Sequence, residues 1–394
     1  MNTLVLPSSS PAAGSPRLWR WLWLALAVAV LCYLPVVLQT RSLFGVRLSN
    51  MQLLNIGLSQ VNLMLISMMG AVSLTYLTGC AGLISIGHAA FYAVGAMVGA
   101  VVGTQWGLPF PLALAAAALM GALVGVVAGL PSLRVRGLYF LLSTLAMHHI
   151  AHFCMSEYQY RFFDVVGIPL PEATLGGYAL DNPMRWYFFL LVLVALVFVG
   201  LSRTMRAREG RALLAMRDHE LAATSVGIDV RILRLKAFGL SSSIAALAGC
   251  LYAYYMTNVN AEFFSLNFAI QFIAMIIVGG MGSLGGALVG AALWLLLPSV
   301  ISGVVTQAGS SGMAWAQAVG NHKPQIVNIT FGLLVVLLLL FLNTSSMMSL
   351  TEAAMAHLVA GDWGRYGRVR LWGSAGFLVT VFAAGAWFEA FGMQ

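Results

Sequence analysis

The sequence predicts an all-α polytopic membrane protein of about ten transmembrane helices, with one further span near the carboxyl end. The chain is 60% hydrophobic and only 8% charged. Its mean hydropathy is +0.91. Because a soluble domain could not bury so much apolar surface, the bilayer must be the solvent for most of the chain.

Apolar segments long enough to cross a bilayer recur along the chain. The first is longer than the apolar part of a signal peptide and no Ala-x-Ala cleavage site follows it, so we expect an uncleaved span. The pattern divides the chain into an amino-terminal tail (1–19), a transmembrane domain (20–342) and a carboxyl-terminal extension with one span (343–394). We expect spans near 20–39, 53–77, 83–103, 110–130, 138–154, 186–202, 237–257, 268–282, 284–302 and 325–342, and one more near 372–392.

Basic residues concentrate in one loop, residues 203–236, which holds eight of the 20 Lys and Arg residues. Loops rich in Lys and Arg stay on the cytoplasmic side of a membrane. The loop from Glu157 to Arg185 is acidic and falls on the opposite side. The amino terminus is therefore predicted to be cytoplasmic. The net charge of +8 reflects this orientation, and we expect no nucleic acid as a partner.

Two long stretches, Leu48 to Leu133 and Phe263 to His322, contain no Asp or Glu. Carriers driven by protons or sodium ions usually place a carboxylate near the middle of the membrane, where it binds the coupling ion. The lack of such a carboxylate disfavours an ion-coupled carrier and favours energy supplied from outside the membrane.

Two short segments, Ser85–Ala89 and Ser283–Ala287, resemble each other, and each opens an apolar helix after a glycine-containing turn. One interpretation is close packing, because small residues let helices approach each other in lipid. The other is a pair of broken helices whose free backbone amides line a solute pathway. His88 suits either a pathway contact or a hydrogen-bonded packing histidine. The pathway candidates are Ser85, Gly87, His88, Ser283 and Gly285.

Within the basic loop, a helix-like segment begins at Gly210, and small residues further on lead to Gly227. A short helix of small residues can lie in a groove of a partner protein, and glycine permits a sharp turn after it. The alternative is an ordinary basic loop that only enforces topology. The residues assigned to a partner contact are Arg211, Arg217, Glu220, Ala222, Ala223 and Gly227.

Three histidines, His148, His149 and His152, fall near the outer end of an expected span. Histidines four residues apart on a helix can share a zinc ion, which raises the hypothesis of an intramembrane metalloenzyme. A third ligand and the glutamate of an H-E-x-x-H motif are missing nearby. We therefore interpret them as interfacial histidines and expect no metal site.

Four sequence blocks occur in order: GLISIGHAAFYAVGA from Gly82, LRVRGLYFLLSTLA from Leu133, GRALLAMRDHELAATSVGI from Gly210, and VGGMGSLGGALVGA from Val278. Together, over about residues 53–341, they resemble the permease family of branched-chain amino acid and urea ABC importers. The resemblance implies a helical permease of the ABC-importer type in the bacterial inner membrane. Its solute would be a branched-chain or related amino acid, with urea, short amides or aromatic acids as alternatives.

The resemblance also implies partners: a second related permease, two ABC ATPases and a periplasmic solute-binding protein. In that family the region 222–227 would contact the ATPase. The chain itself lacks a phosphate-binding Walker motif, because its only lysines, Lys236 and Lys323, do not follow a glycine. We therefore expect no enzymatic activity and no cofactor in this chain, and expect ATP to be used by the partner subunits.

Two features depart from the family pattern. Members often carry a glycine-rich stretch before an external Gly-Ile-Pro, whereas Tyr158–Asp164 precedes Gly167 here, which leaves the solute open. In the extension, Gly364 to Met393 resembles one segment of a major facilitator superfamily transporter. An ion-coupled secondary transporter of that type is therefore the alternative function, although one span cannot form a carrier.

Overall fold

A computed structural model describes residues 33–37, 42–43, 46–47, 56–83, 85–135, 137–163, 167–280 and 282–309, and single positions at 325, 329, 332, 333 and 336. The tail 1–19, the extension 343–394 with its expected span, and most of the expected spans near 20–39 and 325–342 lie outside these residues. The chain divides into two units, Met1–Phe331 and Gly332–Gln394, and the elements described below belong to the first.

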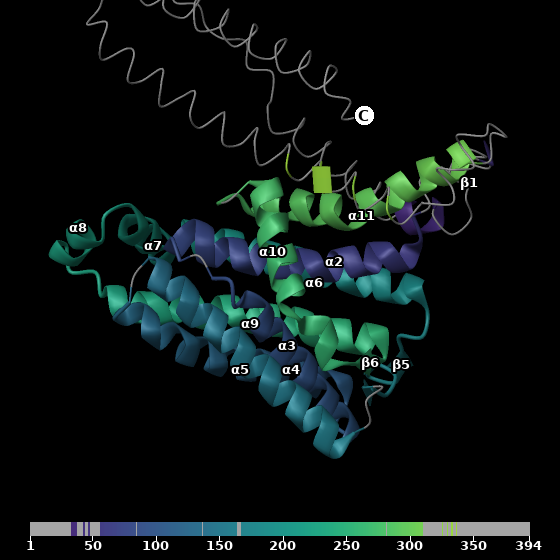
Figure 1. The fold of residues 1–394 in the computed structure, drawn as a ribbon, viewed down its shortest axis with the longest axis horizontal. Coiled ribbons are helices and arrows are strands. Elements are labelled where there is room, and N and C mark those ends of the chain that lie inside the picture. The colour runs from purple at the N-terminus through teal and green to yellow at the C-terminus, as the bar shows by residue number, and fades with distance from the viewer. Residues whose placement is uncertain are drawn as a thin grey trace, which may run out of the picture. The chain divides into compact units, whose positions relative to one another are not determined.

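The described part of this unit is mostly helical (Figure 1). Its α-helices are α2 (Leu58–Thr75), α3 (His88–Thr104), α4 (Phe110–Gly129), α5 (Leu138–Phe162), α6 (Pro183–Arg206), α7 (Arg208–Asp218), α8 (Glu220–Ser225), α9 (Val230–Met256), α10 (Leu266–Gly279) and α11 (Leu284–Gly309). A π-helical turn, η2 (Tyr76–Cys80), extends α2, and two 3₁₀ turns are η3 (Leu130–Leu133) and η4 (Ala261–Phe264).

The described residues also include three antiparallel pairs of two-residue strands, which the all-α prediction did not contain. The pairs form where connecting segments fold back on themselves or on a helix end. They are β1 (Ser42–Leu43) with β2 (Val46–Arg47), β3 (Ile168–Pro169) with β6 (Asn258–Val259), and β4 (Thr174–Leu175) with β5 (Tyr178–Ala179).

Side-chain caps explain where several helices begin. Asn182 accepts a hydrogen bond from the Met184 N–H at the start of α6 (3.0 Å). Asp229 caps α9 in the same way, through the N–H groups of Arg231 and Ile232. Ser283 accepts from the Gly286 N–H at the start of α11 (3.1 Å). Each cap satisfies amide groups that the first turn of a helix otherwise leaves unpaired.

Five described helices are long and apolar enough to cross a membrane, which supports a polytopic membrane protein: Leu58–Cys80, Phe110–Leu133, Pro183–Arg206, Val230–Met256 and Leu284–Gly303. Two apolar helices are shorter, α3 with 17 residues and α10 with 14. At 1.5 Å per residue α10 is about 21 Å long, less than the apolar thickness of a bilayer. The total number of spans stays a prediction.

The expected span 138–154 is helical but less apolar than the five helices above. It lies in α5, which has 25 residues but is not among the five helices that combine length with sufficient apolarity. The histidines on α5, together with Glu157 and Arg161, lower its hydropathy. A helix of this composition suits a position against protein or at the membrane interface better than one surrounded by lipid.

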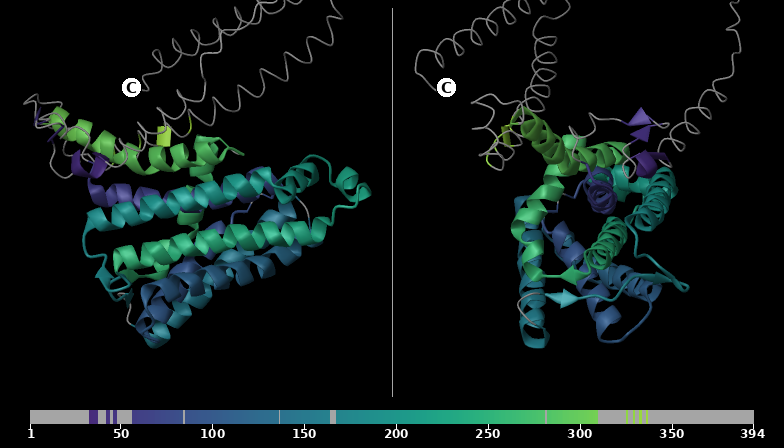
Figure 2. Two further views of the ribbon diagram at one scale, coloured as in Figure 1. Left: turned by 180° about the vertical axis from the view of Figure 1, so that it is seen from behind. Right: turned by 90° about the vertical axis from the view of Figure 1, so that its right-hand side faces the viewer.

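Two helices, α2 and α9, form the centre of the unit. The apolar windows of their spans are 78% and 67% buried, whereas those of α4, α6 and α11 are only 33%, 22% and 28% buried. Helix α9 packs against α3 and α4 on one side and against α2 on the other (Figure 2). The outer helices expose large apolar side chains such as Leu119 and Leu196, as expected for surfaces that face lipid or another membrane subunit.

Glycines bring the backbones of α3 and α9 into direct contact. A Cβ on Gly95 would overlap the Ala246 carbonyl oxygen, and a Cβ on Gly249 would overlap the Tyr92 carbonyl oxygen. In a membrane, where apolar side chains gain little by leaving lipid, such close approach is a main source of helix association. These glycines therefore determine the distance between α3 and α9.

Candidate functional site

The segment between α6 and α9, the middle of the basic loop 203–236, is a compact helical structure and not an extended loop. Helix α6 continues to Arg206, and α7 begins at Arg208, two residues before the helix-like segment expected from the sequence. The chain turns sharply here, since a Cβ on Gly210 would overlap the Met205 carbonyl oxygen. The segment lies at one end of the helices, and β5 and β6 lie at the other (Figure 1). We call residues 207–229 the coupling segment.

Helix α7 packs one face against the membrane helices. Leu213 and Met216 are buried and lie on this face. An exposed ion pair joins Glu209 to Lys236 on α9 (2.6 Å). Exposed pairs contribute little to stability, so the apolar face is the main attachment of α7.

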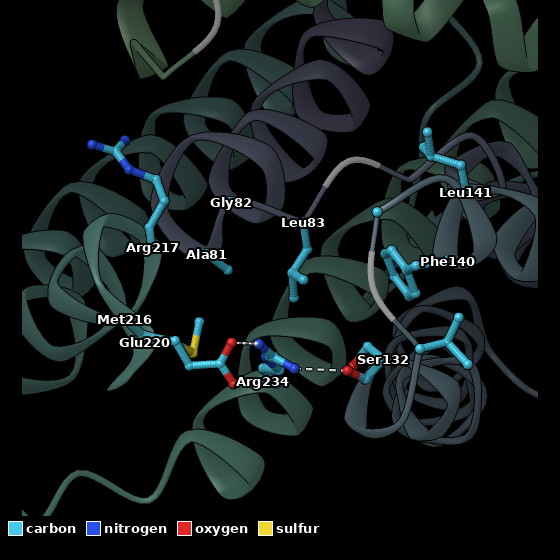
Figure 3. Close-up of a pocket in the computed structure, with 12 residues that line it drawn as sticks. Ala81, Gly82, Leu83, Ser132, Phe140, Leu141, Met216, Arg217, Glu220 and Arg234 are labelled. Atoms are coloured by element: carbon cyan, nitrogen blue, oxygen red, sulfur yellow. Dashed lines mark hydrogen bonds and ion pairs between the residues drawn. The ribbon is translucent and has the colours of Figure 1, made fainter. Parts of the chain in front are cut away.

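A buried arginine of α9 holds the start of α8. Arg234 is 8% exposed, its Nη2 pairs with Glu220 Oε2 (2.8 Å), and its Nη1 donates to the Ser132 carbonyl oxygen (2.7 Å). Figure 3 shows Arg234 between Glu220 and Ser132. The three residues line a cavity of about 460 Å³ between the coupling segment and the ends of α2 and α4. Arg234 thus fixes Glu220, a residue assigned from the sequence to the partner contact.

Sequence reasoning did not assign Arg234 to the site. The sequence does not single it out, because Arg231 and Lys236 lie in the same first turns of α9. A buried arginine in such a position needs an acidic or carbonyl partner. Which partner it finds depends on the tertiary fold.

We predict that Arg234→Ala destabilises the protein by about 1–3 kcal/mol, because it removes the buried guanidinium group that pairs with Glu220 and donates to the Ser132 carbonyl oxygen. Arg231→Ala, on the exposed face of the same helix, is the matched control and should cost less than about 0.5 kcal/mol. Thermal unfolding of the two purified variants in detergent measures the difference. Equal melting temperatures would show that the buried pair has no net stabilising effect.

Helix α8 presents an exposed surface at the tip of the coupling segment. Leu221 and Val226 are 84% and 82% exposed, although both are apolar. Ala222 is exposed as well, whereas Ala223 is 4% exposed and packs inward. Gly227 follows with a φ of +87°, a conformation that favours glycine, and a Cβ there would meet nothing within 4 Å. The sequence analysis did not assign Leu221 and Val226 to the site, because their exposure is seen only when the orientation of α8 is known.

The two arginines of α7 that were assigned to the partner contact lie differently. Arg211 Nη1 donates to the Arg206 carbonyl oxygen at the end of α6 (3.3 Å). Arg217 instead donates to the carbonyl oxygen of Gly79 at the end of α2 (2.6 Å). The structure therefore leaves Ala222 and Gly227 exposed near the tip, holds Glu220 against Arg234 and turns Arg217 towards the membrane helices.

The two glycine turns expected to flank the pathway lie against each other. A Cβ on Gly79 would lie 2.5 Å from the Gly282 Cα atom. Helix α3 begins directly after the first turn and α11 directly after the second. The structure thus brings together two segments that the sequence related only by their similarity.

The first pathway segment, 85–88, is buried among α2, α3 and α5. His88 is 1% exposed, and its Nε2 forms a hydrogen bond with Ser73 Oγ (2.8 Å). Gly87 lies against α5, since a Cβ on it would overlap the Thr144 carbonyl oxygen. Ser85 Oγ and His88 Nδ1 are buried without a hydrogen-bond partner in the described structure. His88 therefore has one nitrogen in a packing contact and one nitrogen unpaired.

The second pathway segment is open. Ser283 and Gly285 are both exposed at the start of α11, and a Cβ on Gly285 would meet nothing within 4 Å. The first amide groups of a helix carry partial positive charge and can bind an anion such as a carboxylate. The start of α11 could therefore contact a carboxylate without a fixed positive charge.

The three histidines of α5 do not form a metal site in the described part of the chain, where no group of three or more potential ligands is suitably arranged. The ring centroids of His148 and His152 are 6.4 Å apart, and those of His148 and His149 are 5.7 Å apart. His148 is buried against neighbouring helices. The geometry favours a packing role for His148, whereas His149 is exposed.

A comparison with protein families finds one match over most of the described chain. The model of the family described as the permease component of branched-chain amino acid transport systems matches residues 57–342. This range contains the coupling segment and both glycine turns. No solved structure matches the chain.

Curated relatives point to the same group of proteins. The chain is 31% identical over 240 residues to the high-affinity branched-chain amino acid transport system permease protein LivM of Escherichia coli (strain K12), covering 54% of this chain and 56% of that protein. It is 29% identical over 159 residues to a probable LivM protein of Methanocaldococcus jannaschii, covering 40% and 45% of the two chains. The chain thus spans about half the length of the curated relatives it matches.

Proposed function

Since this chain belongs to the family of permease components of branched-chain amino acid transport systems, we propose that it is a membrane-spanning subunit of an ATP-driven ABC importer. The observation that carries this proposal is the exposed tip of the coupling segment, where apolar side chains and Gly227 project from a rigidly held helix pair. In this proposal the tip lies on the cytoplasmic side of the bacterial inner membrane, as does the amino terminus. The excess of Lys and Arg over acidic residues in the whole loop 203–236 supports that orientation.

The proposed partners are a second related permease, two ABC ATPases and a periplasmic solute-binding protein. Helix α8 has the features of a contact helix, because Leu221 and Val226 form an apolar surface with no partner in the described chain. Exposed apolar side chains at the centre of a docking surface supply most of its binding energy, whereas the surrounding charges set its orientation. ATP would be bound and hydrolysed by the ATPases alone.

The proposed solute is a branched-chain or related amino acid. The curated relatives carry that solute in their names. The exposed start of α11 would present the partial positive charge of a helix amino end to a carboxylate, and the apolar helix behind it suits an aliphatic side chain. Ser85, Gly87, His88, Ser283 and Gly285 remain the proposed pathway residues.

Co-purification tests the proposed function directly. The tagged full-length chain is extracted in mild detergent, and an ABC ATPase and a second permease are expected to accompany it. The purified complex, reconstituted with its binding protein, should take up leucine only when ATP is supplied. Uptake by the chain alone in a proton or sodium gradient would instead support the secondary-transporter alternative. Competition by urea, short amides or aromatic acids would identify a different solute.

We predict that Leu221→Asp lowers the recovery of the ATPase by about tenfold or more, because it places a charge at the centre of the proposed apolar contact. The side chain is 84% exposed, so the substitution should leave the fold and the amount of protein in the membrane unchanged. Quantitative immunoblotting of the co-purified ATPase gives the measurement. Full recovery of the ATPase would place its contact elsewhere on the chain.

A further inference from the structure

Helix α2 ends in an unusual turn beside the coupling segment. Its last residues, Tyr76–Cys80, form the π-helical turn η2, after which the Leu83 N–H donates back to the Leu77 carbonyl oxygen (3.3 Å). Single π-helical turns are rare and occur frequently at functional sites. Gly79 lies in this turn, at a helix end where carbonyl groups lack the partner that a continuing helix would provide.

Arg217 of α7 provides that partner. Its Nη1 donates to the Gly79 carbonyl oxygen (2.6 Å), although the two residues are 138 positions apart in the sequence. Its Nε and Nη2 both donate to Asp218 Oδ1 (3.1 and 3.0 Å). Its aliphatic stem lies on the chain that leaves α2, since a Cβ on Gly82 would lie 2.6 Å from the Arg217 Cγ atom. The guanidinium group is therefore fixed between α7 and the end of α2.

The same turn contacts the second glycine turn. Gly79 touches the backbone of Gly282, which has a φ of +95° and precedes the cap residue of α11, Ser283. The chain leaving Gly79 continues through Gly82 to the buried segment that contains His88. One hydrogen bond from the coupling segment thus reaches the point from which both proposed pathway segments begin. Figure 3 shows Arg217 at the cavity that Ala81, Gly82 and Leu83 also line.

We propose that Arg217 is a positioning residue that transmits displacement of the coupling segment to the two glycine turns. This inference rests on the proposed importer function. Its guanidinium is planar and held by several hydrogen bonds, so movement of α7 pulls on the Gly79 carbonyl group instead of being absorbed by side-chain rotation. In this role Arg217 acts inside the permease. The sequence analysis had instead predicted that it contacts the ATPase.

The test uses the complete complex with Arg217→Met, which keeps the stem over Gly82 and removes every donor of the guanidinium group. We expect the ATPase to co-purify and to hydrolyse ATP as in the wild type, while ATP-driven leucine uptake falls about tenfold or more. Arg217→Lys should restore part of the uptake, because an ammonium group can reach one acceptor but not both. Arg208→Ala removes an exposed arginine from the same helix and serves as the charge-matched control, with normal uptake.

The reactivity of Cys80 distinguishes transmission of movement by Arg217 from a purely structural role of that residue. It is a free, buried cysteine next to Gly79. With Cys32, Cys154 and Cys250 replaced by alanine, the rate of Cys80 alkylation by a membrane-permeant maleimide is measured with and without ATP and vanadate. We expect ATP to change that rate when Arg217 is present and to have no effect in Arg217→Met.

Three results would overturn the inference. Normal uptake with a normal ATP effect on Cys80 would show that the hydrogen bond transmits nothing. Loss of the ATPase from the Arg217→Met complex would show that Arg217 is an ATPase contact after all. If no ATPase co-purifies with the wild-type chain, the proposed importer function is wrong, and so is this inference. The wild-type experiment shows this before any variant is made.

Discussion

Gly227→Trp is expected to abolish solute uptake while the protein still reaches the membrane in normal amount. Gly227 ends the turn after α8, and a side chain there would project into open space beside the exposed Val226 in the chain. A tryptophan would occupy the surface on which the ATPase is proposed to dock. The left-handed backbone conformation adds a local strain of about 1–2 kcal/mol, which an exposed turn tolerates more easily than a helix does.

Uptake of labelled leucine by membrane vesicles, normalised to the amount of chain on an immunoblot, measures this effect. Gly227→Asn is the matched control, because asparagine adopts the left-handed conformation more readily than other residues with a side chain and is small. It should retain most of the uptake. Normal uptake by Gly227→Trp would contradict the assignment of this tip to the ATPase contact.

Gly95→Ala is expected to destabilise the protein by about 3 kcal/mol or more, or to prevent its accumulation. The added methyl group overlaps the Ala246 carbonyl oxygen of α9, and a backbone atom of a central helix cannot move aside as a side chain can. The two helices would have to separate, and the matching contact between Gly249 and Tyr92 would be lost with them.

The control for this prediction is Gly200→Ala in α6. That glycine is also within a membrane helix, but a Cβ there meets nothing within 4 Å. Alanine has the higher helix propensity by about 1 kcal/mol, so the same substitution should be neutral or stabilising at this position. Thermal unfolding in detergent gives both values. A similar melting temperature for the two variants would show that the glycine contact between α3 and α9 does not determine the stability of the unit.

Those parts of the fold that depend on local sequence were predictable. The expected spans at 110–130, 186–202 and 284–302 each correspond to a long apolar helix. The caps at Asn182 and Asp229 are residues that favour helix starts in any context. The family resemblance, carried by four short blocks, is confirmed by a match over residues 57–342.

The parts that depend on contacts distant in sequence were not predictable. The pairing of Arg217 with Gly79 and of Arg234 with Ser132 joins residues 138 and 102 positions apart. Basic residues on an amphipathic helix give no sign of which one will turn inward. The same holds for Ala222 and Ala223, which are identical residues at neighbouring positions, one exposed and one buried. Only the helix orientation distinguishes them.

Helix α9 connects the two ends of the unit. It runs without a break for 27 residues, about 40 Å, from Val230, one turn before the buried Arg234, to Met256, just before the strand in which Val259 pairs with Ile168. A continuous helix of this length provides a physical connection through which the two ends of the unit can be coupled. If an event at the end near Arg234 changes the affinity of the opposite end for a ligand, that ligand must change the equilibrium at the Arg234 end by the same factor.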